Sequence, residues 1–418
     1  MEGVERIDGG PRSVIVIGSG IVGLSVAWFL QERGVEVTVV DRTGVAAGAS
    51  WGNAGWIAPA LTSPLNQPPV LRQGLRSLFD SAAPLHIPLR PDPALAAFLL
   101  RFAANCRWST ARRVVRANLP LNAECLEAFD VLAANGVDAP MTDAPVVALF
   151  DSPEGAAELS DALCYLRAQG QAGVEFTVLT GAELRDFVPL AGSSVSTALA
   201  VESQRYVDPG RFVTTLGRAV AARGATMVDL DVTQVVPTRS RVSVFGRAGA
   251  ELTADAVVVA TGAWLNDLVR KWIRQPVRAG RGYSFTVPVD HPVPVPIYLP
   301  VQRVACTPYQ GRLRVAGTME FSDPDHPVVA ARVDAVVASA RKMLDGVHWA
   351  DRSDVWVGPR PVSADGRPLI GAAAPGVYVA GGHGMWGLAH GPVTGRLLAE
   401  QITTGKQPEA LREFDPLR

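Results

Sequence analysis

The chain has little cysteine and almost no excess of charge of either sign. Cys106, Cys125, Cys164 and Cys306 are scattered, without a C-x-x-C pair and without a histidine at metal-ligand spacing. A disulfide framework and a zinc site are therefore not indicated, and a reducing cytosol fits best. The 39 Lys and Arg residues against 40 Asp and Glu residues give a net charge of −1. This composition gives no reason to expect nucleic acid or anionic lipid as a partner, so we expect a small molecule.

Long hydrophobic runs are missing as well, because Pro, Arg, Asp or Gly interrupts every candidate for the roughly 20 apolar residues that span a bilayer. The most apolar helical stretch, 94–104, is too short. We interpret it as a core helix, with a membrane-surface or partner-docking helix as the alternative. Residues 1–12 lack the apolar run of a signal peptide and are expected to form a loose tail. We expect a cytoplasmic protein, or one held peripherally at the inner face of the membrane.

A β-α-β unit begins the chain after this tail. With 418 residues and 48% hydrophobic content, the chain is long enough for two domains. Residues 14–17 form an apolar run typical of a buried strand, 21–33 have the pattern of a helix with Gly34 after its end, and 36–40 form a second strand. The sequence therefore predicts an α/β fold that starts with a Rossmann-type dinucleotide-binding unit.

Composition changes indicate a second, interleaved domain. Residues 59–93 are rich in Pro, Ser and Gly, which indicates a crossing between domains. Thr180 and Glu183 have capping-box spacing for a helix over 181–187, and Asp208-Pro209 is typical of a helix start. Alternating strands over 282–289 and 303–321 predict an antiparallel sheet. We assign 13–60, 200–268 and 355–418 to the dinucleotide-binding domain, and 61–199 and 269–354 to an α+β substrate-binding domain built on that sheet.

The first strand ends in a glycine-rich turn, Gly18-Ser19-Gly20-Ile21-Val22-Gly23. This spacing gives a tight turn, a close approach of the backbone to phosphate and close helix–strand packing, with a diphosphate at the helix N-terminus. Asp41 ends the next strand, where it can bind ribose hydroxyls. A glycine turn without a ligand is the alternative. The turn alone does not separate NAD from FAD.

Three further segments favour FAD. Residues 42–55 are small and glycine-rich, as suits a segment beside an extended cofactor, although a surface loop is the alternative. The strand 257–260 ends in the small-residue turn of Thr261 and Gly262, and an ordinary strand end is the alternative there. Residues 376–387 form a strand and a glycine loop before a helix that we expect near Pro392. Helix and amide dipoles there would stabilise negative charge at the flavin N1–C2=O edge, which NAD dehydrogenases do not need.

Residues 358–371 are the most informative segment for the substrate. Arg360 follows a short expected strand and lies between two prolines, so its guanidinium can bind a carboxylate bidentately, although a solvent-facing arginine is the ordinary alternative. Asp365-Gly366 is expected to form a turn between paired strands, at a position from which it can also approach the flavin.

Taken together, these segments resemble the D-amino-acid oxidase and glycine oxidase superfamily, most closely its bacterial D-amino-acid dehydrogenase small-subunit branch. The resemblance rests on Gly18 to Gly23, Ala49 to Gly55 followed by Ile57-Ala58-Pro59, Thr261 to Trp264, Gly282-Tyr283-Ser284, Gly358 to Pro361 with Asp365-Gly366, and Gly382-His383-Gly384. It covers nearly the whole chain. Met385-Trp386-Gly387-Leu388 departs from the commoner Thr-Leu-Gly-Trp pattern of this family.

The resemblance implies roles for particular residues. Arg360 would bind the substrate carboxylate, and Tyr283 would face the substrate unless it is a core aromatic. His383 would hydrogen-bond near the flavin ring or serve packing. Cys306 lies in a strand whose counterpart is not a tether, so noncovalent FAD is expected. The expected FAD contacts are Gly18, Gly20, Ile21, Val22, Gly23, Asp41, Arg42, Ala49, Ser50, Asn53, Ala54, Gly55, Val232, Thr261, Gly262, Trp264, Arg360, Gly382, His383, Gly384, Met385, Gly387 and Leu388.

The reaction that the resemblance implies is oxidation of a D-amino acid, or of a cyclic or N-substituted relative, by hydride transfer to flavin N5. The imino acid would then hydrolyse to the 2-oxo acid, and electrons would pass to a quinone, a carrier or oxygen. Three alternatives stay open. They are an oxygen-using amino-acid or amine oxidase, a 2-hydroxy-acid dehydrogenase with His383 as its base, and a flavin-binding subunit that is active only in a complex. Such a subunit would dock through an apolar stripe on 94–135.

Overall fold

The structure, a computed structural model, describes residues 10–77, 85–87 and 91–418. The expected N-terminal tail thus lies mostly outside the described residues. A largely parallel sheet is built from β1 (Ser13–Ile17), β2 (Glu36–Asp41), β10 (Thr226–Asp229), β14 (Ala256–Val259), β20 (Leu369–Ala374) and β21 (Val377–Gly381). Its strand order is β10-β2-β1-β14-β21-β20, with β20 antiparallel to β21.

This parallel sheet is covered on both faces, which explains why its strands are continuously apolar. Val14 and Val16 of β1 pack in the core that contains α1 (Ile21–Glu32), α7 (Pro209–Ala222) and α10 (Gly387–Thr404). Ile15 and Ile17 alternate with them and pack in a second core. The elements of that second core are β11 (Val232–Pro237), β12 (Val242–Gly246), β13 (Glu251–Ala254) and α8 (Leu265–Val269).

A second, larger sheet has the strand order β19-β15-β18-β17-β16-β6-β8-β7, with β4 beside β18. Its strands are β4 (Leu85–His86), β6 (Val146–Phe150), β7 (Phe176–Thr180), β8 (Thr197–Val201), β15 (Val277–Val287), β16 (Ile297–Leu299), β17 (Val304–Tyr309), β18 (Arg312–Phe321) and β19 (Ser353–Ser363). Its pairs are antiparallel except β16 with β6 and β18 with β4. The helix α9 (Ala330–Ala340) contributes to the core on one face of this sheet.

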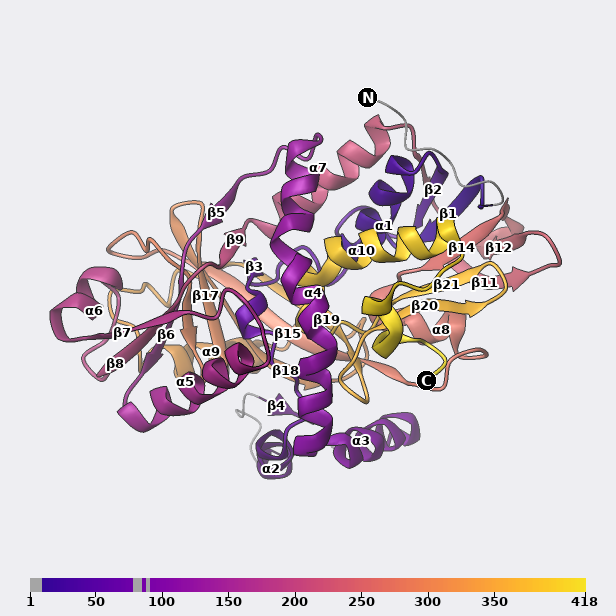
Figure 1. Cartoon of the computed structure of the whole chain (residues 1–418). Coiled ribbons are helices and arrows are strands. Elements are labelled where there is room, and N and C mark those ends of the chain that lie inside the picture. The colour runs from indigo at the N-terminus through magenta and orange to yellow at the C-terminus, as the bar shows by residue number, and fades with distance from the viewer. Residues whose placement is uncertain (1–9, 78–84, 88–90) are drawn as a thin grey trace.

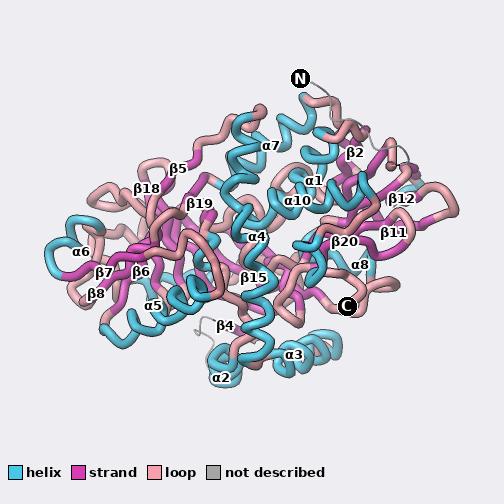
Figure 2. Tube along the Cα trace, in the orientation of Figure 1, coloured by secondary structure: helices cyan, strands magenta, loops and turns pink. Residues whose placement is uncertain are grey.

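The remaining elements connect the two sheets or lie at the margins. They are β3 (Trp56–Ile57), β5 (Met141–Asp143), β9 (Arg205–Val207), α2 (Pro68–Ser77), α3 (Pro93–Asn105), α4 (Trp108–Ala134), α5 (Pro153–Ala168), α6 (Gly181–Phe187) and the 3-10 turns η1 (Pro59–Leu61), η2 (Arg247–Gly249), η3 (Gly262–Trp264) and η4 (Glu409–Phe414). The long helix α4 packs against α10 and crosses the middle of the molecule in Figure 1. In Figure 2 the strands accordingly form two groups, one with β11, β12 and β20 and one with β6, β7 and β8.

The expected α/β class and the Rossmann-type unit are confirmed, whereas several local predictions are wrong. The helix α10 begins at Gly387 rather than near Pro392, which lies inside it. Thr180 is the N-cap residue of α6 but makes no side-chain capping hydrogen bond. The apolar stripe of α4 is packed inside the chain, with Leu121, Phe129 and Leu132 in the core that α1 and α10 share. This stripe of α4 thus covers the chain's own core, whereas Leu100 of α3 and Trp108 at the start of α4 are exposed.

The strand β19 is much longer than expected. It runs over Ser353–Ser363 as an edge strand of the larger sheet, so Arg360 lies inside a strand and pairs with Gly280. Residues 355–363, which we assigned to the dinucleotide-binding domain, thus pair with β15. The two prolines around Arg360 fit an edge strand, because they lack the N–H that an inner strand would have to donate.

Candidate FAD site

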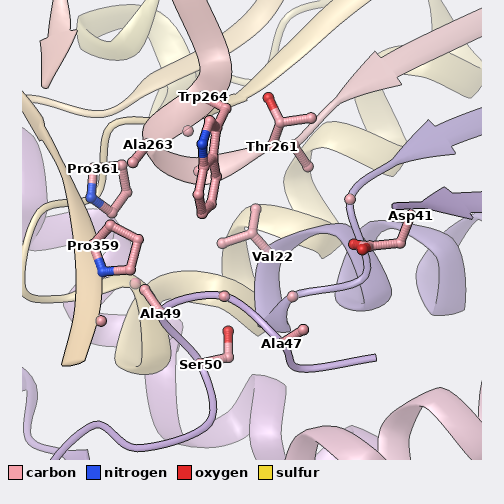
Figure 3. A pocket seen from close by; sticks show the side chains of 18 of the residues that line it. Val22, Asp41, Ala47, Ala49, Ser50, Thr261, Ala263, Trp264, Pro359 and Pro361 are labelled. Carbon is pink, nitrogen blue, oxygen red and sulfur yellow. The ribbon is translucent and has the colours of Figure 1, made fainter. Parts of the chain in front are cut away.

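A cavity of about 560 Å³ lies where β1, β2 and β14 of the parallel sheet end. Ligands of α/β sheets bind in this place, outside the carboxyl ends of the strands. The cavity continues from there to the edge of β19. Figure 3 shows Asp41 at one end, Pro359 and Pro361 at the other, and Val22 between them. An elongated ligand would therefore extend from the strand ends of one sheet to the edge of the other.

The glycine turn after β1 is required by packing. Gly18 has φ +110°, and a methyl group on it would lie 2.5 Å from the Ala260 carbonyl oxygen. A methyl group on Gly23 would lie 1.9 Å from the Gly18 oxygen. These contacts bring α1 close to β1 and β14, so that Gly20, Ile21 and Val22 at the start of this helix line the cavity. The N–H groups in the first turn of a helix have no intrahelical acceptor and favour an anion.

Asp41 and Ser50 are fixed beside this helix N-terminus. Asp41 Oδ2 accepts a hydrogen bond from the Ser19 N–H at 2.8 Å, and its Oδ1 accepts from the Thr43 N–H at 2.9 Å. Oδ1 also accepts from the Thr43 hydroxyl and the Gly44 N–H, so Oδ2 is the oxygen that can still accept from a ribose hydroxyl. Ser50 Oγ accepts from the Ile21 N–H at 3.0 Å, which leaves its proton for a phosphate oxygen.

The cavity contains a buried polar atom whose hydrogen-bonding capacity is not satisfied. Thr261 Oγ1 is buried and has no hydrogen-bond partner among the described residues, although Thr261 lines the cavity. A buried hydroxyl without a partner costs about 1–3 kcal/mol, so a bound polar group would satisfy it. At the far end α10 begins at Gly387 without a side-chain cap, and Gly387 and Leu388 line the cavity. The residues present thus fit a dinucleotide that carries phosphates and a polar ring.

Three side chains from separate segments meet over the cavity. Trp264 Nε1 donates to Asp325 Oδ2 at 3.1 Å, and the Arg42 Nη2 group donates to Asp325 Oδ1 at 3.4 Å. The Arg42 guanidinium also lies over the Trp264 ring, 4.6 Å from its centroid. We call this group the Asp325 clasp. The sequence predicted Arg42 and Trp264 here, but an aspartate in the loop after β18 gave no recognisable signal.

Arg360 lies on the edge strand β19 with its guanidinium over the backbone of Gly282. A methyl group on Gly282 would lie 2.0 Å from Arg360 Cζ. Arg360 Nη1 donates to the Thr318 carbonyl oxygen at 2.8 Å, and Thr318 has φ +60° where β18 bulges. The guanidinium is half-buried and lines the cavity, and no carboxylate forms an ion pair with it among the described residues. Burial lowers the pKa of Arg360 to about 10, so it stays charged at neutral pH.

The side chain of Tyr283 lies on the face of the sheet opposite to Arg360. Gly282 and Ser284 share the face of the sheet with Arg360, and because side chains alternate along a strand, Tyr283 points to the opposite face. There its hydroxyl donates to Glu320 Oε2 at 2.7 Å, and burial together with Glu320 raises the pKa of Tyr283 to about 12. Although Tyr283 borders the cavity, it is a core aromatic with an occupied hydroxyl.

His383 lies beside the cavity as a buried, neutral side chain. Its Nε2 is 3.0 Å from Thr394 Oγ1 in α10. Burial, with a smaller contribution from His390, lowers the pKa of His383 to about 3. His390 is also buried, with Nε2 2.8 Å from Asn122 Oδ1 and its pKa lowered to about 4 by burial. His383 is therefore a weak base that orders the loop before α10.

Most of the predicted contacts line this cavity. They are Gly18, Gly20, Ile21, Val22, Asp41, Arg42, Ala49, Ser50, Asn53, Val232, Thr261, Gly262, Trp264, Arg360, His383, Gly384, Met385, Gly387 and Leu388. The predicted contacts that do not line it are Gly23, Ala54, Gly55 and Gly382. Gly23 and Gly55 serve backbone packing instead, since a methyl group on Gly55 would lie 2.2 Å from the Val207 oxygen.

One further prediction from the sequence is wrong, and two residues that line the cavity were not predicted. Asp365 does not approach the cavity, because it is buried in ion pairs with Arg367 and Arg418, and the turn that it begins joins β19 and β20 of different sheets. Trp356 and Ala316 line the cavity near Arg360 and were missed. Their position follows from strand register, which the sequence alone did not give.

Residues 13–401 match the model of the DAO family, described as FAD dependent oxidoreductase, so the chain belongs to this family. It is 29% identical to D-amino acid dehydrogenase from Vibrio vulnificus over 417 residues, 97% of this chain and 99% of the relative. Glycine oxidase from Bacillus cereus superposes with a TM-score of 0.72 at 22% identity, covering 97% and 99% of the two chains. Iminodiacetate oxidase from Chelativorans sp. BNC1 gives 0.73 at 20% identity, with the same coverage.

These comparisons confirm the family resemblance and the class of enzyme, an oxidoreductase with FAD as its cofactor. In the described part of the chain, no group of His, Cys, Asp and Glu side chains could hold a metal ion. Cys306 is fully buried in the core of the larger sheet, and burial raises the pKa of its thiol to about 12. None of the described helices is long and apolar enough to cross a membrane.

Proposed function

We propose that the protein oxidises a D-α-amino acid, or a cyclic or N-substituted relative, to the imino acid, which water then hydrolyses to the 2-oxo acid. The observation that carries this proposal is Arg360, a charged guanidinium that faces the cavity and is held by the carbonyl oxygen of a bulged strand. A guanidinium in this position can bind a carboxylate through two parallel hydrogen bonds. The name of the Vibrio vulnificus relative supports the amino acid and its D configuration.

In this reaction the residues of the chain mainly position the substrate and exclude water from the site. Noncovalent FAD, when bound, supplies the redox chemistry by accepting a hydride from the substrate α-carbon at its N5 atom. Arg360 fixes the carboxylate and thereby the α-carbon, while the uncapped start of α10 lines the cavity with Gly387 and Leu388. A neutral substrate amine can expel the hydride by itself, so the reaction needs no protein base.

The rival reaction, oxidation of a 2-hydroxy acid, requires a base for the hydroxyl proton. His383 is the candidate that the sequence offered, but its low pKa and its contact with Thr394 make it a poor proton acceptor. The structure thus favours an amine substrate. The electron acceptor, a quinone, a carrier or oxygen, is a separate question, and release of hydrogen peroxide in air would identify an oxidase.

Anaerobic reduction of the purified holoenzyme tests the proposal. D- and L-amino acids, N-methyl amino acids, prolines and 2-hydroxy acids are mixed with the enzyme, and loss of the flavin absorbance is followed. We expect rapid bleaching by at least one D-amino or cyclic amino acid and none by the matching hydroxy acid. Bleaching by hydroxy acids alone would overturn the proposal. Turnover of the isolated chain with an artificial acceptor would further exclude a subunit that is active only in a complex.

A further inference from the structure

Beside Arg360, three positions on the cavity face of the larger sheet carry only glycine or alanine. Gly282 of β15 and Gly358 of β19 are register partners, and Ala316 of β18 pairs with the next residue on the same face, Ser284. Gly358 and Ala316 line the cavity and are buried. Partners directly across two strands place their Cβ positions about 5 Å apart. The glycine pair therefore forms a flat floor on which larger side chains can lie.

Two side chains occupy this floor next to each other. A methyl group on Gly358 would lie 1.9 Å from Cη2 of Trp356. In the same way, the Arg360 guanidinium covers the Gly282 position. The benzo ring of Trp356 thus lies on Gly358, adjacent to the carboxylate-binding group. A methyl group on Gly52 would lie 2.4 Å from Cδ2 of the same indole. Trp356 is therefore in contact with glycine backbone of both β19 and the loop after β2.

The loop that contains Gly52 is fixed to the same sheet. Ser284 Oγ donates to the Gly52 carbonyl oxygen at 2.6 Å, and Thr307 Oγ1 donates to the Ala54 oxygen at 2.6 Å. Because the loop cannot move away without breaking these bonds, the indole has little freedom to leave the floor. The hydrogen bonds of this loop therefore hold the indole in its position beside Arg360.

Several of the charged residues that line the cavity already have ion-pair partners. Asp231 pairs with Arg247, and Asp325 pairs with Arg42 and accepts a hydrogen bond from Trp264. Among the described lining residues, those around Trp356 include no carboxylate and no cation other than Arg360. Arg314, which lies on the same sheet face through its pairing with Thr286, does not line the cavity, so a charged substrate side chain would have no partner among these lining residues, and an unpaired charge in such a place is costly.

We propose that Trp356 is the residue that determines substrate specificity. Its indole forms the apolar wall of a compartment beside Arg360 that accepts neutral amino acids with an apolar or cyclic side chain and rejects charged ones. This inference rests on the proposed function, because it assumes that Arg360 binds the substrate carboxylate. With its carboxylate on Arg360, the substrate would place the side chain of its α-carbon in this compartment.

Binding of carboxylates that cannot be oxidised tests this wall without turnover. Straight-chain acids from acetate to octanoate are titrated into the oxidised holoenzyme, and the Kd is taken from the change in the flavin spectrum. In the wild type each methylene buried against the indole should tighten binding about fourfold until the compartment is full. In Trp356→Ala the limit should move to longer chains, with an intermediate profile for Trp356→Phe. Glutarate should bind at least about tenfold more weakly than pentanoate, which has the same length.

Controls separate the failure of this inference from the failure of the proposed function. Trp108→Ala removes an exposed tryptophan that does not line the cavity and should leave the profile unchanged. If Arg360→Met binds all acids as the wild type does, the proposed function is wrong. If binding depends on Arg360 but Trp356→Ala and Trp356→Phe keep the wild-type chain-length limit, or glutarate binds as tightly as pentanoate, Trp356 is not the specificity wall.

Discussion

Replacement of Arg360 by methionine should abolish most of the catalytic efficiency while the protein still binds FAD. Methionine keeps a long apolar stem over Gly282 but removes the charge and the bond to the Thr318 carbonyl oxygen. Loss of one partner from a desolvated charge pair costs about 2–5 kcal/mol, which corresponds to a decrease of about 30-fold to several thousand-fold in kcat/KM. The half-buried position of Arg360 favours the middle of this range.

Arg360→Lys is the matched control, because it keeps the charge and loses the planar fork. Lysine cannot bind a carboxylate bidentately while also donating to the Thr318 oxygen in the same geometry, so we expect activity between those of the wild type and Arg360→Met.

The pKa of Arg360, about 10, provides a second test. The Kd of propionate, which does not titrate above pH 6, should be constant from pH 7 to 9. It should then rise about tenfold per pH unit as the free guanidinium loses its proton above about pH 10.

Rapid-reaction measurements under anaerobic conditions provide the assay. The rate of flavin reduction at saturating substrate and its half-saturation concentration are measured for the three proteins, with FAD content determined by absorbance. Wild-type kinetics on carboxylate substrates in Arg360→Met, with full FAD content, would refute the reasoning. A fall in activity that only follows loss of FAD would likewise assign Arg360 to cofactor binding instead of substrate binding.

Three further predictions concern the cofactor and the fold. Asp325→Ala removes the clasp on Trp264 and should raise the FAD Kd about tenfold in fluorescence titrations of the apoprotein, whereas an unchanged Kd would show that the clasp does not hold FAD. Gly23→Ala should destabilise the fold by about 3 kcal/mol or more in urea unfolding, because its methyl group collides with backbone, and wild-type stability would contradict that packing. The free energy of unfolding should fall as the pH decreases from about 6.5 toward 4, since His383 and His390 bind protons only when unfolded, and a double Gln variant that keeps the full slope would contradict this origin.

The cofactor half of the site was largely predictable from the sequence because its determinants are local. The glycine spacing at Gly18 and Gly20 and the aspartate that ends β2 depend on short stretches of backbone geometry. Turns of this kind keep their conformation in any chain that continues into a suitable strand and helix. The same reasoning predicted Thr261, since a small residue after a buried strand lies at the edge of the sheet where ligands bind.

The substrate half was less predictable because it depends on strand register and on pairs distant in sequence. A shift of one residue moves a side chain to the other face of the sheet. The sequence could not show that Tyr283 faces Glu320 while Arg360 and Trp356 share the face above Gly282 and Gly358. Likewise, the length of β19 follows from its pairing with β15, and periodicity around two prolines gave no sign of it.

The most direct measurement of the proposed reaction is product analysis after a single turnover. One equivalent of a D-amino acid with an apolar side chain, such as D-norvaline, is added to the holoenzyme without oxygen or another acceptor. We predict that each bound FAD is reduced and that one 2-oxo acid and one ammonia form per flavin, at a rate that Arg360→Met lowers at least about 30-fold. FAD that stays oxidised with every amino acid, or a 2-oxo acid formed from a hydroxy acid without ammonia, would contradict the proposed function.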